Sequence, residues 1–231
     1  MTDILHKAHF QAMTGTTHRQ IIANLDKDQR DNLLARSDRA GLIHLAGHLA
    51  VLGLTGVWIW SGAPLWQLGL LVHGVALIFL FTLLHECVHE TPFATRPLNT
   101  LVATVCGCIL VLPAQWFTYF HLAHHRHTHV PGRDPELAAP KPQSWRQYLI
   151  YMSGLPVWWS QVQVLVANAG NGAIDEFVPG DKHAKVRREA RLAIALYILL
   201  GLISWYAGSA ILLWLWIGPA LLGQPFLRGY L

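Results

Sequence analysis

The amino-acid sequence predicts an all-α integral membrane protein with about four transmembrane helices in two hairpins, together with interfacial helices and a histidine-rich cytoplasmic region. Only 13% of the residues are charged, whereas soluble domains carry about 25%. Two long runs, 40–85 and 192–227, contain no Asp, Glu, Lys or Arg. A helix needs about 20 residues to cross a bilayer, so each run is too long for one crossing and long enough for two.

Each charge-free run therefore divides into two predicted spans. The first forty residues are polar and lack an apolar stretch long enough for a signal peptide, so we expect a cytoplasmic arm over residues 1–40. The first run predicts spans over 41–60 and 65–84, separated by a short uncharged turn. The second run predicts spans over 191–206 and 209–226.

The basic residues set the expected orientation in the membrane. With these spans, all 17 Lys and Arg residues lie on one side, in 1–40, in 85–191 and at Arg228. The positive-inside rule makes that side cytoplasmic, which for a bacterial protein means a multi-pass protein of the cytoplasmic membrane. Because these residues flank the apolar runs and form no single stripe, the net charge of +4 indicates topology and no nucleic-acid partner.

Two further apolar segments are expected to lie at the membrane without crossing it. Residues 97–120 are long enough to cross once, but a crossing would separate the histidines that flank them. We therefore predict an interfacial or re-entrant helix interrupted by Pro113. A second such segment is expected over 145–167, where Pro156 breaks the run. The chain as a whole, residues 1–231, is predicted to form one membrane domain.

Five histidines at helical spacing are the predicted metal ligands. His85 and His89 are four residues apart, so both imidazoles lie on one face of a helix. His121, His124 and His125 repeat this spacing at the far end of the 97–120 segment. Neutral imidazole binds iron, zinc and copper. Since protonation blocks metal binding, we expect any activity of this site to fall at low pH.

Other polar residues near these clusters are expected to orient the ligands. Carboxylates and imidazoles next to metal ligands commonly hold the ligand rings in place. The candidates are Glu86, His127, His129, Asp134 and Glu136. Three more histidines lie within the predicted spans, where polar groups are costly. They are expected to hydrogen-bond between helices or to lie near the metal or substrate: His44, His48 and His73.

The first cluster also matches the H-E-x-x-H signature of zinc proteases. In that reading His85 and His89 bind zinc, and Glu86 is the general base. It leaves the second cluster without a role, because five imidazoles exceed one tetrahedral zinc site. It also requires an acidic third ligand from a later helix, for which the candidates lie in no recognisable motif: Asp175, Glu176, Asp181 and Glu189.

The two clusters together resemble the histidine boxes of the membrane fatty acid desaturase and hydroxylase superfamily. That family has H-x-x-x-H followed by H-x-x-H-H. The string His85-Glu-Cys-Val-His-Glu-Thr-Pro-Phe-Ala-Thr-Arg-Pro-Leu-Asn99 is similar to the first box of bacterial desaturase-like proteins. Trp116-Phe-Thr-Tyr-Phe-His-Leu-Ala-His-His-Arg-His-Thr-His129, followed by Arg133-Asp-Pro-Glu136, is similar to the second. The resemblance covers roughly residues 40–231.

The resemblance implies an O2-dependent oxidoreductase, either a desaturase or a hydroxylase. Two iron ions held by histidines would attack an unactivated C–H bond of a lipid or fatty acyl chain. The sequence has no cysteine-rich iron–sulfur motif and no dinucleotide fingerprint. Electrons are therefore expected from an external donor, a ferredoxin or a cytochrome with its reductase. The sequence departs from the family at Val88 and Glu90, where such proteins often have small residues.

A larger departure concerns a third histidine box. The family has another H-x-x-H-H after the fourth span, whereas no histidine follows His183 here. Two boxes supply five imidazoles, about half of a complete di-iron set. We therefore expect this 231-residue chain to be catalytically incomplete, and a non-catalytic remnant that binds metal without turnover is an open alternative.

Overall fold

The computed structural model describes residues 18–230, and every regular element within them is a helix. The prediction of an all-α fold is confirmed. Residues 1–17, which belong to the predicted arm 1–40, lie outside the described part. The chain divides into two units, Met1–Ser37 and Asp38–Leu231. In the first unit, α2 (His18–Asn24) is followed by α3 (Lys27–Leu34), which begins with a capping box between Asp26 and Gln29.

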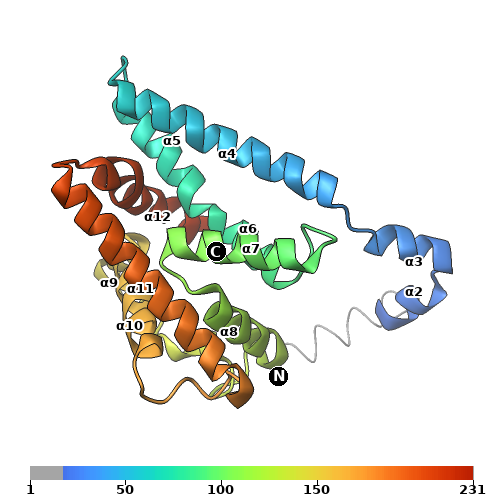
Figure 1. Cartoon of the computed structure of the whole chain (residues 1–231). Coiled ribbons are helices and arrows are strands. Elements are labelled where there is room, and N and C mark those ends of the chain that lie inside the picture. The colour runs from blue at the N-terminus through green and yellow to red at the C-terminus, as the bar shows by residue number, and fades with distance from the viewer. Residues whose placement is uncertain (1–17, 231) are drawn as a thin grey trace. The chain divides into compact units, whose positions relative to one another are not determined.

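The second unit holds the helices that are relevant to the membrane and to the histidines (Figure 1). Its α-helices are α4 (Asp38–Ser61), α5 (Trp66–Ile78), α6 (Leu80–Val88), α7 (Arg96–Leu110), α8 (Ala114–His127), α9 (Trp145–Met152), α10 (Leu155–Ala169), α11 (His183–Tyr206) and α12 (Gly218–Tyr230). Two short 3-10 turns, η1 (Pro135–Ala138) and η2 (Gly180–Lys182), and one π-helical turn, η3 (Leu213–Ile217), complete it.

Three segments of the described chain are long and apolar enough to cross a membrane: Lys27–Ser61, Trp66–Val88 and Gly180–Tyr206. The first two form the predicted hairpin, with α4 and α5 side by side in Figure 1. All three segments expose apolar side chains. Leu54 of α4 and Trp205 of α11, for example, are 73% and 87% exposed. Such surfaces are suited to lipid and not to water. The predicted fourth span, 209–226, is divided between η3 and α12.

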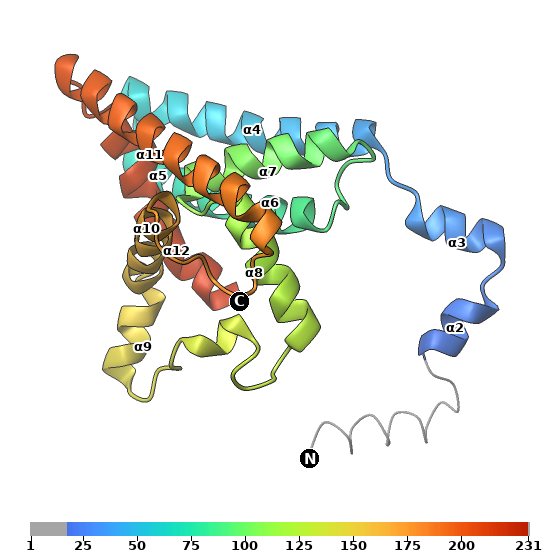
Figure 2. The same ribbon diagram turned by 60° about the horizontal axis from the view of Figure 1, so that its bottom comes forward.

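The segment between the two histidine clusters does not run straight. α7 and α8 meet at an angle of 99°, and Figure 2 shows α8 turning away from α7. Val111, at the end of α7, has a left-handed backbone with φ of 58°, and the next N–H, of Leu112, donates to the carbonyl of Gly107 at 2.8 Å. A Cβ on Gly107 would lie 2.5 Å from the Leu112 oxygen. The predicted interruption at Pro113 is confirmed, since α8 begins directly after it.

The core of this unit lies among α6, α7 and α8, next to the histidines. Its buried residues come from all three helices and from the loop after α6: Leu80, Leu84, Phe93, Val102, Cys106, Leu110 and Phe117. α6 carries His85 and α8 carries His121, so packing of these helices against α7 fixes the distance between the two histidine clusters.

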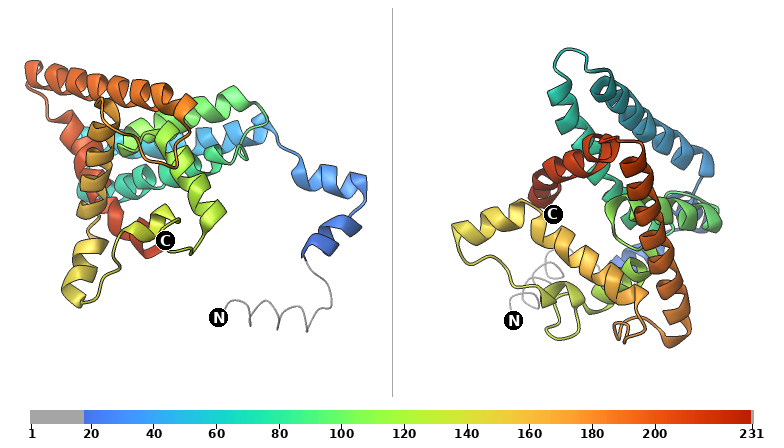
Figure 3. Two further views of the ribbon diagram at one scale, coloured as in Figure 1. Left: turned by 90° about the horizontal axis from the view of Figure 1, so that it is seen from below. Right: turned by 60° about the vertical axis from the view of Figure 1, so that its left-hand side comes forward.

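The predicted interfacial segment 145–167 consists of α9 and α10. Pro156 lies in the first turn of α10, where its missing N–H costs nothing. α9 exposes Trp145 and Leu149, at 81% and 66%, and both views of Figure 3 show it at the edge of this unit. A short helix with exposed aromatic and apolar side chains fits the boundary between head groups and acyl chains.

Two glycines allow α5 and α12 to cross in backbone contact. A Cβ on Gly74 would lie 2.0 Å from the carbonyl oxygen of Pro219, and a Cβ on Gly223 would lie 2.2 Å from the oxygen of Gly74. Small residues at such crossings are typical of membrane helices, because close backbone approach replaces the missing hydrophobic driving force.

A buried histidine of α5 joins this helix to η3 and to α4. Nε2 of His73 lies 3.0 Å from the carbonyl oxygen of Leu215 in η3, and its Nδ1 lies 2.7 Å from Oγ1 of Thr55 on α4. The carbonyl needs a donor, so Nε2 carries the proton and Nδ1 accepts from the threonine hydroxyl. His48 likewise reaches the Ala76 oxygen at 2.8 Å. Both histidines therefore form hydrogen bonds between helical segments, which is one of the two roles predicted for them.

The glycine crossing predicts a site-specific effect of one added methyl group. Gly74→Ala should lower the free energy of unfolding by about 1–3 kcal/mol, because backbone must move to admit the Cβ. Gly53→Ala is the matched control, since a Cβ on Gly53 of α4 meets nothing within 4 Å. It should be neutral or slightly stabilising. Thermal unfolding in detergent measures both, and equal melting temperatures would contradict the close crossing.

Candidate metal centre

α6 supplies the first pair of histidines. His85 lies in its last turn and His89 directly follows it, so that their ring centroids are 4.9 Å apart. The helix stops here because Glu90 has a left-handed backbone, with φ of 58°. Nδ1–H of His85 donates to Glu86 at 3.0 Å, and Thr91 donates to the other carboxylate oxygen at 2.7 Å. Glu86 thereby fixes the His85 ring and leaves its Nε2 as the nitrogen with a free lone pair.

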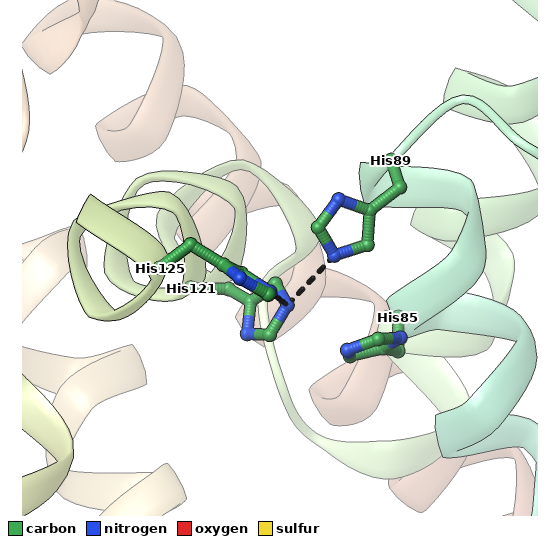
Figure 4. Close-up of side chains that lie close together, drawn as sticks. All are labelled: His85, His89, His121 and His125. Atoms are coloured by element: carbon green, nitrogen blue, oxygen red, sulfur yellow. Dashed lines mark hydrogen bonds between the residues drawn. The ribbon is translucent and has the colours of Figure 1, made fainter. Parts of the chain in front are cut away.

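α8 supplies the second pair from the opposite side (Figure 4). Nε2 of His121 lies 2.9 Å from Nε2 of His89 and 2.9 Å from Nε2 of His125. The ligand atoms of His85, His89, His121 and His125 all lie within 4.8 Å of one another. Four imidazoles from two helices, thirty-odd residues apart in sequence, therefore converge on one point.

Hydrogen bonding alone does not account for this convergence. A neutral imidazole nitrogen either donates one proton or accepts at one lone pair. Nε2 of His121 has two nitrogen neighbours at 2.9 Å, so it cannot form a good hydrogen bond with both. A cation among the nitrogens would satisfy every lone pair at once, and imidazole suits iron, zinc and copper. The donor set therefore fits a metal ion.

The surroundings of the cluster favour neutral rings. Burial lowers the pKa of His89, and the nearby His85 and His125 lower it further. The ring of Phe117 stacks on His121 at 5.4 Å and meets Phe81 edge-on at 5.6 Å. One side of the cluster is thus aromatic and dry, which disfavours imidazolium and leaves nitrogen lone pairs available for a metal.

His124 is the predicted ligand that the structure does not place in the four-histidine cluster. Its Nδ1 lies 2.9 Å from Asp134 and 3.4 Å from Glu136. Asp134 also accepts the backbone N–H groups of His129 and Glu136, at 2.8 and 3.0 Å. Burial by itself would raise the pKa of Asp134, but the His124 and backbone hydrogen bonds lower it. Asp134 therefore holds His124 as an ionised carboxylate.

The remaining residues expected to orient ligands have different surroundings. Glu86, Asp134 and Glu136 contact ligand-box histidines directly, as described above. His129 contributes its backbone N–H to Asp134 and has a left-handed φ of 62°, while its side chain is exposed. His127 is half-buried at the end of α8, and its carbonyl accepts from Val130 at 2.8 Å. His44 is exposed on α4.

Two carboxylates that sequence reasoning did not assign to the site hold α8 in place. Pro113 precedes α8 and cannot cap it, so the first N–H groups of this buried helix need another acceptor. Glu189 of α11 provides it, accepting from the Gln115 N–H at 2.8 Å. Asp175 accepts from the indole N–H of Trp116 at 2.7 Å. Both are too distant in sequence from α8 for any motif to reveal them.

Neither of these carboxylates is part of the histidine cluster. Asp175 and Glu189 were candidates for the acidic third ligand of a zinc protease, and both are instead bound to α8. Asp181 pairs with Lys182 at 2.7 Å. Among residues 18–230, the group arranged to hold a metal consists of four histidines.

Comparison with known proteins adds one finding. A sequence model of the fatty acid desaturase family matches residues 63–231, well over half of the chain. No curated protein and no solved structure matches the chain significantly.

The capping contact predicts the effect of removing the Glu189 carboxylate. Glu189→Ala should lower the free energy of unfolding by about 1–3 kcal/mol, because the Gln115 N–H is left buried without an acceptor. Glu189→Gln keeps a carbonyl oxygen and should recover part of this loss. Glu176→Ala, at an exposed carboxylate, is the control. Chemical or thermal unfolding is the measurement, and a Glu189→Ala protein as stable as the control would refute the capping role.

The histidine cluster predicts how the metal-free protein responds to pH. The pKa of His89 is lowered in the folded state, so below about pH 6.5 the unfolded chain takes up protons first. Stability should therefore be constant above that pH and fall as the pH decreases below it. His89→Gln should reduce this slope and His44→Gln should not. Melting temperatures of the metal-free variants between neutral and acidic pH test this, and an unchanged slope in His89→Gln would be the contrary result.

Proposed function

This chain belongs to the fatty acid desaturase family, and we propose that it is an O2-dependent iron oxidoreductase that acts on lipid acyl chains as a desaturase or hydroxylase. Family membership implies the oxidoreductase class. The observation that supports the iron site is the convergence of His85, His89, His121 and His125 from α6 and α8. The long apolar helices α4, α5 and α11 make the bilayer the natural source of the substrate.

The first iron would be held by the four converging imidazoles. Iron bound there would supply O2 activation for attack on an unactivated C–H bond. Glu86 keeps the proton of His85 on Nδ1, so that Nε2 faces the metal. Phe81 and Phe117 exclude water from one side of the cluster and provide an apolar wall suited to an acyl chain.

His124 is assigned to the second iron of the pair. Its Nδ1 is bound to Asp134, which leaves Nε2 as its only nitrogen for a metal. Along an α-helix, residues 124 and 125 point about 100° apart, so the two neighbouring histidines suit two different ions. His127, His129 and Glu136 are the nearest further candidates to support this second ion, and its remaining ligands would come from beyond the two boxes.

The reaction also requires an electron donor. Forming one double bond removes two hydrogen atoms from the acyl chain, whereas full reduction of O2 to water takes up four electrons, so two electrons and two protons must come from outside. A ferredoxin, or a cytochrome with its reductase, is the proposed partner. The basic residues lie in the segments predicted to be cytoplasmic, where such a soluble carrier would have access.

The direct assay is oxidation of acyl lipid by the purified, iron-loaded chain. Supplied with O2, reduced ferredoxin and phospholipid, a version of the chain extended with a third histidine box should give a product that has lost two hydrogens or gained one oxygen by mass spectrometry, whereas the 231-residue chain should give little or none. Iron binding by both forms without any oxidised lipid would support the non-catalytic alternative, and turnover by the 231-residue chain alone would contradict its predicted incompleteness.

Removing a ligand should reduce iron binding. His85→Ala, His89→Ala, His121→Ala and His125→Ala should each weaken iron affinity by roughly 10- to 100-fold or more. His183→Ala is the control, because that ring hydrogen-bonds to the Val178 carbonyl at 3.0 Å, outside the cluster. Iron content after equilibration with a competing chelator is the measurement. Variants that all retain iron like the control would rule out the four-histidine site.

The variant Glu86→Gln separates the iron oxidoreductase from the zinc-protease reading. A glutamine oxygen can still accept from His85, so iron binding should persist with a modest loss. In a protease, the same change would remove the general base and abolish peptide hydrolysis while zinc remains bound. Retained zinc with complete loss of a measurable peptidase activity would overturn the proposed function.

A further inference from the structure

Arg228, at the end of α12, has no anionic partner among residues 18–230. It is the only charged residue after Arg191. Its guanidinium carbon lies 5.8 Å from the ring centroid of Tyr151 on α9. Its Nε is buried and has no hydrogen-bond acceptor among residues 18–230. A buried N–H of this kind normally has an acceptor.

A second unpartnered polar group lies one helical turn earlier. Gln224 is 4% exposed, and its side-chain oxygen has no hydrogen-bond partner in the described residues. It packs on the junction of α9 and α10, where a Cβ on Gly154 would lie 2.4 Å from its side chain. Rotation of the Gln224 side-chain amide by 180° exchanges its oxygen and its NH2 group, so either can face a ligand at this position. The right-hand view of Figure 3 shows the end of α12 beside this junction.

The junction itself adds positive potential. α10 has 15 residues and starts after Gly154. Ser153 Oγ accepts the Leu155 N–H at 3.3 Å and the Gly154 carbonyl accepts the Trp158 N–H at 3.0 Å, so this end contributes the positive potential of its dipole and few free N–H donors. The guanidinium of Arg228 and the N-terminal end of α10 thus both lie at the α9–α10 junction, with the Gln224 amide between them in sequence and packed on Gly154.

The place of this region in the membrane indicates the kind of acceptor. α9 exposes Trp145 and Tyr148, the residue types that gather at head-group depth. Arg228 follows a charge-free run, on the side where the other basic residues are predicted to lie. Negatively charged lipids are attracted to basic residues at this level.

We propose that Arg228, Gln224 and the N-terminal turn of α10 form a binding site for the phosphate of an anionic membrane phospholipid. The guanidinium, stacked on Tyr151, provides the charge and a fork of N–H donors that matches phosphate oxygens. The Gln224 amide supplies a further contact, and the acyl chains lie along the apolar surface of α12. This site depends on the membrane location of the chain and is independent of the iron chemistry.

The test compares lipids of different head group on the intact chain in neutral detergent. Phosphatidylglycerol should raise the melting temperature at lower concentration than phosphatidylcholine does. Arg228→Gln should weaken the apparent phosphatidylglycerol affinity about tenfold, the loss expected for a hydrogen bond to a charged group. Arg146→Gln removes the same charge from an exposed position on α9 and should retain the preference.

Each outcome decides the proposal. Equal phosphatidylglycerol affinity in Arg228→Gln and Arg146→Gln would overturn it, as would the absence of any preference in the unaltered chain. If millimolar inorganic phosphate abolishes the lipid effect, the ligand is a free phosphate, and the lipid assignment is wrong. Should Arg228→Gln not fold, Arg228→Lys keeps the charge and loses the fork, so a several-fold weaker affinity is expected and an unchanged one refutes the site. Iron content measured in parallel should be the same in all variants.

Discussion

The histidines of α6 and α8 can share a metal ion only because the chain between them bends sharply. Buried backbone N–H and C=O groups need partners, so a turn between two packed helices must satisfy its own polar groups. The 99° bend between α7 and α8 meets this requirement. Leu112 donates back to Gly107, and Glu189 caps the helix that Pro113 leaves uncapped. The position of the whole α8 box depends on this one turn.

Three carboxylates from different parts of the chain then fix α8 along its length. Glu189 holds its first turn, Asp175 holds Trp116 near its start, and Asp134 holds His124 near its end. In each contact a carboxylate side chain from elsewhere in the chain bonds to a group of α8. An assembly of four imidazoles needs such support, because its nitrogens crowd together and stabilise nothing until a cation is bound.

Much of the fold follows from residue patterns that act over short distances. The charge-free runs and Pro113 predict the spans and the bend, and i, i+4 spacing predicts that His85 pairs with His89 and His121 with His125. His124 is about 100° from His125 around the helix and bonds to Asp134 and not to the other three rings, which the i, i+3 spacing from His121 does not predict. The contacts of Glu189 and Asp175 join residues 74 and 59 positions apart. No local periodicity encodes such pairings, which arise only when the helices pack.

The π-helical turn η3 determines which residues of the last span face α5. An α-helix rotates about 100° per residue, so Leu215 and Gly223 would lie roughly 80° apart around an ideal helix. A π turn rotates less per residue, and both residues meet α5, one through His73 and the other through Gly74. A π turn holds about one residue more than an α-helical turn. It therefore acts like a one-residue insertion and changes which side of the helix the following residues face. A single-residue deletion in this span would therefore move one of the two contacts with α5 out of register.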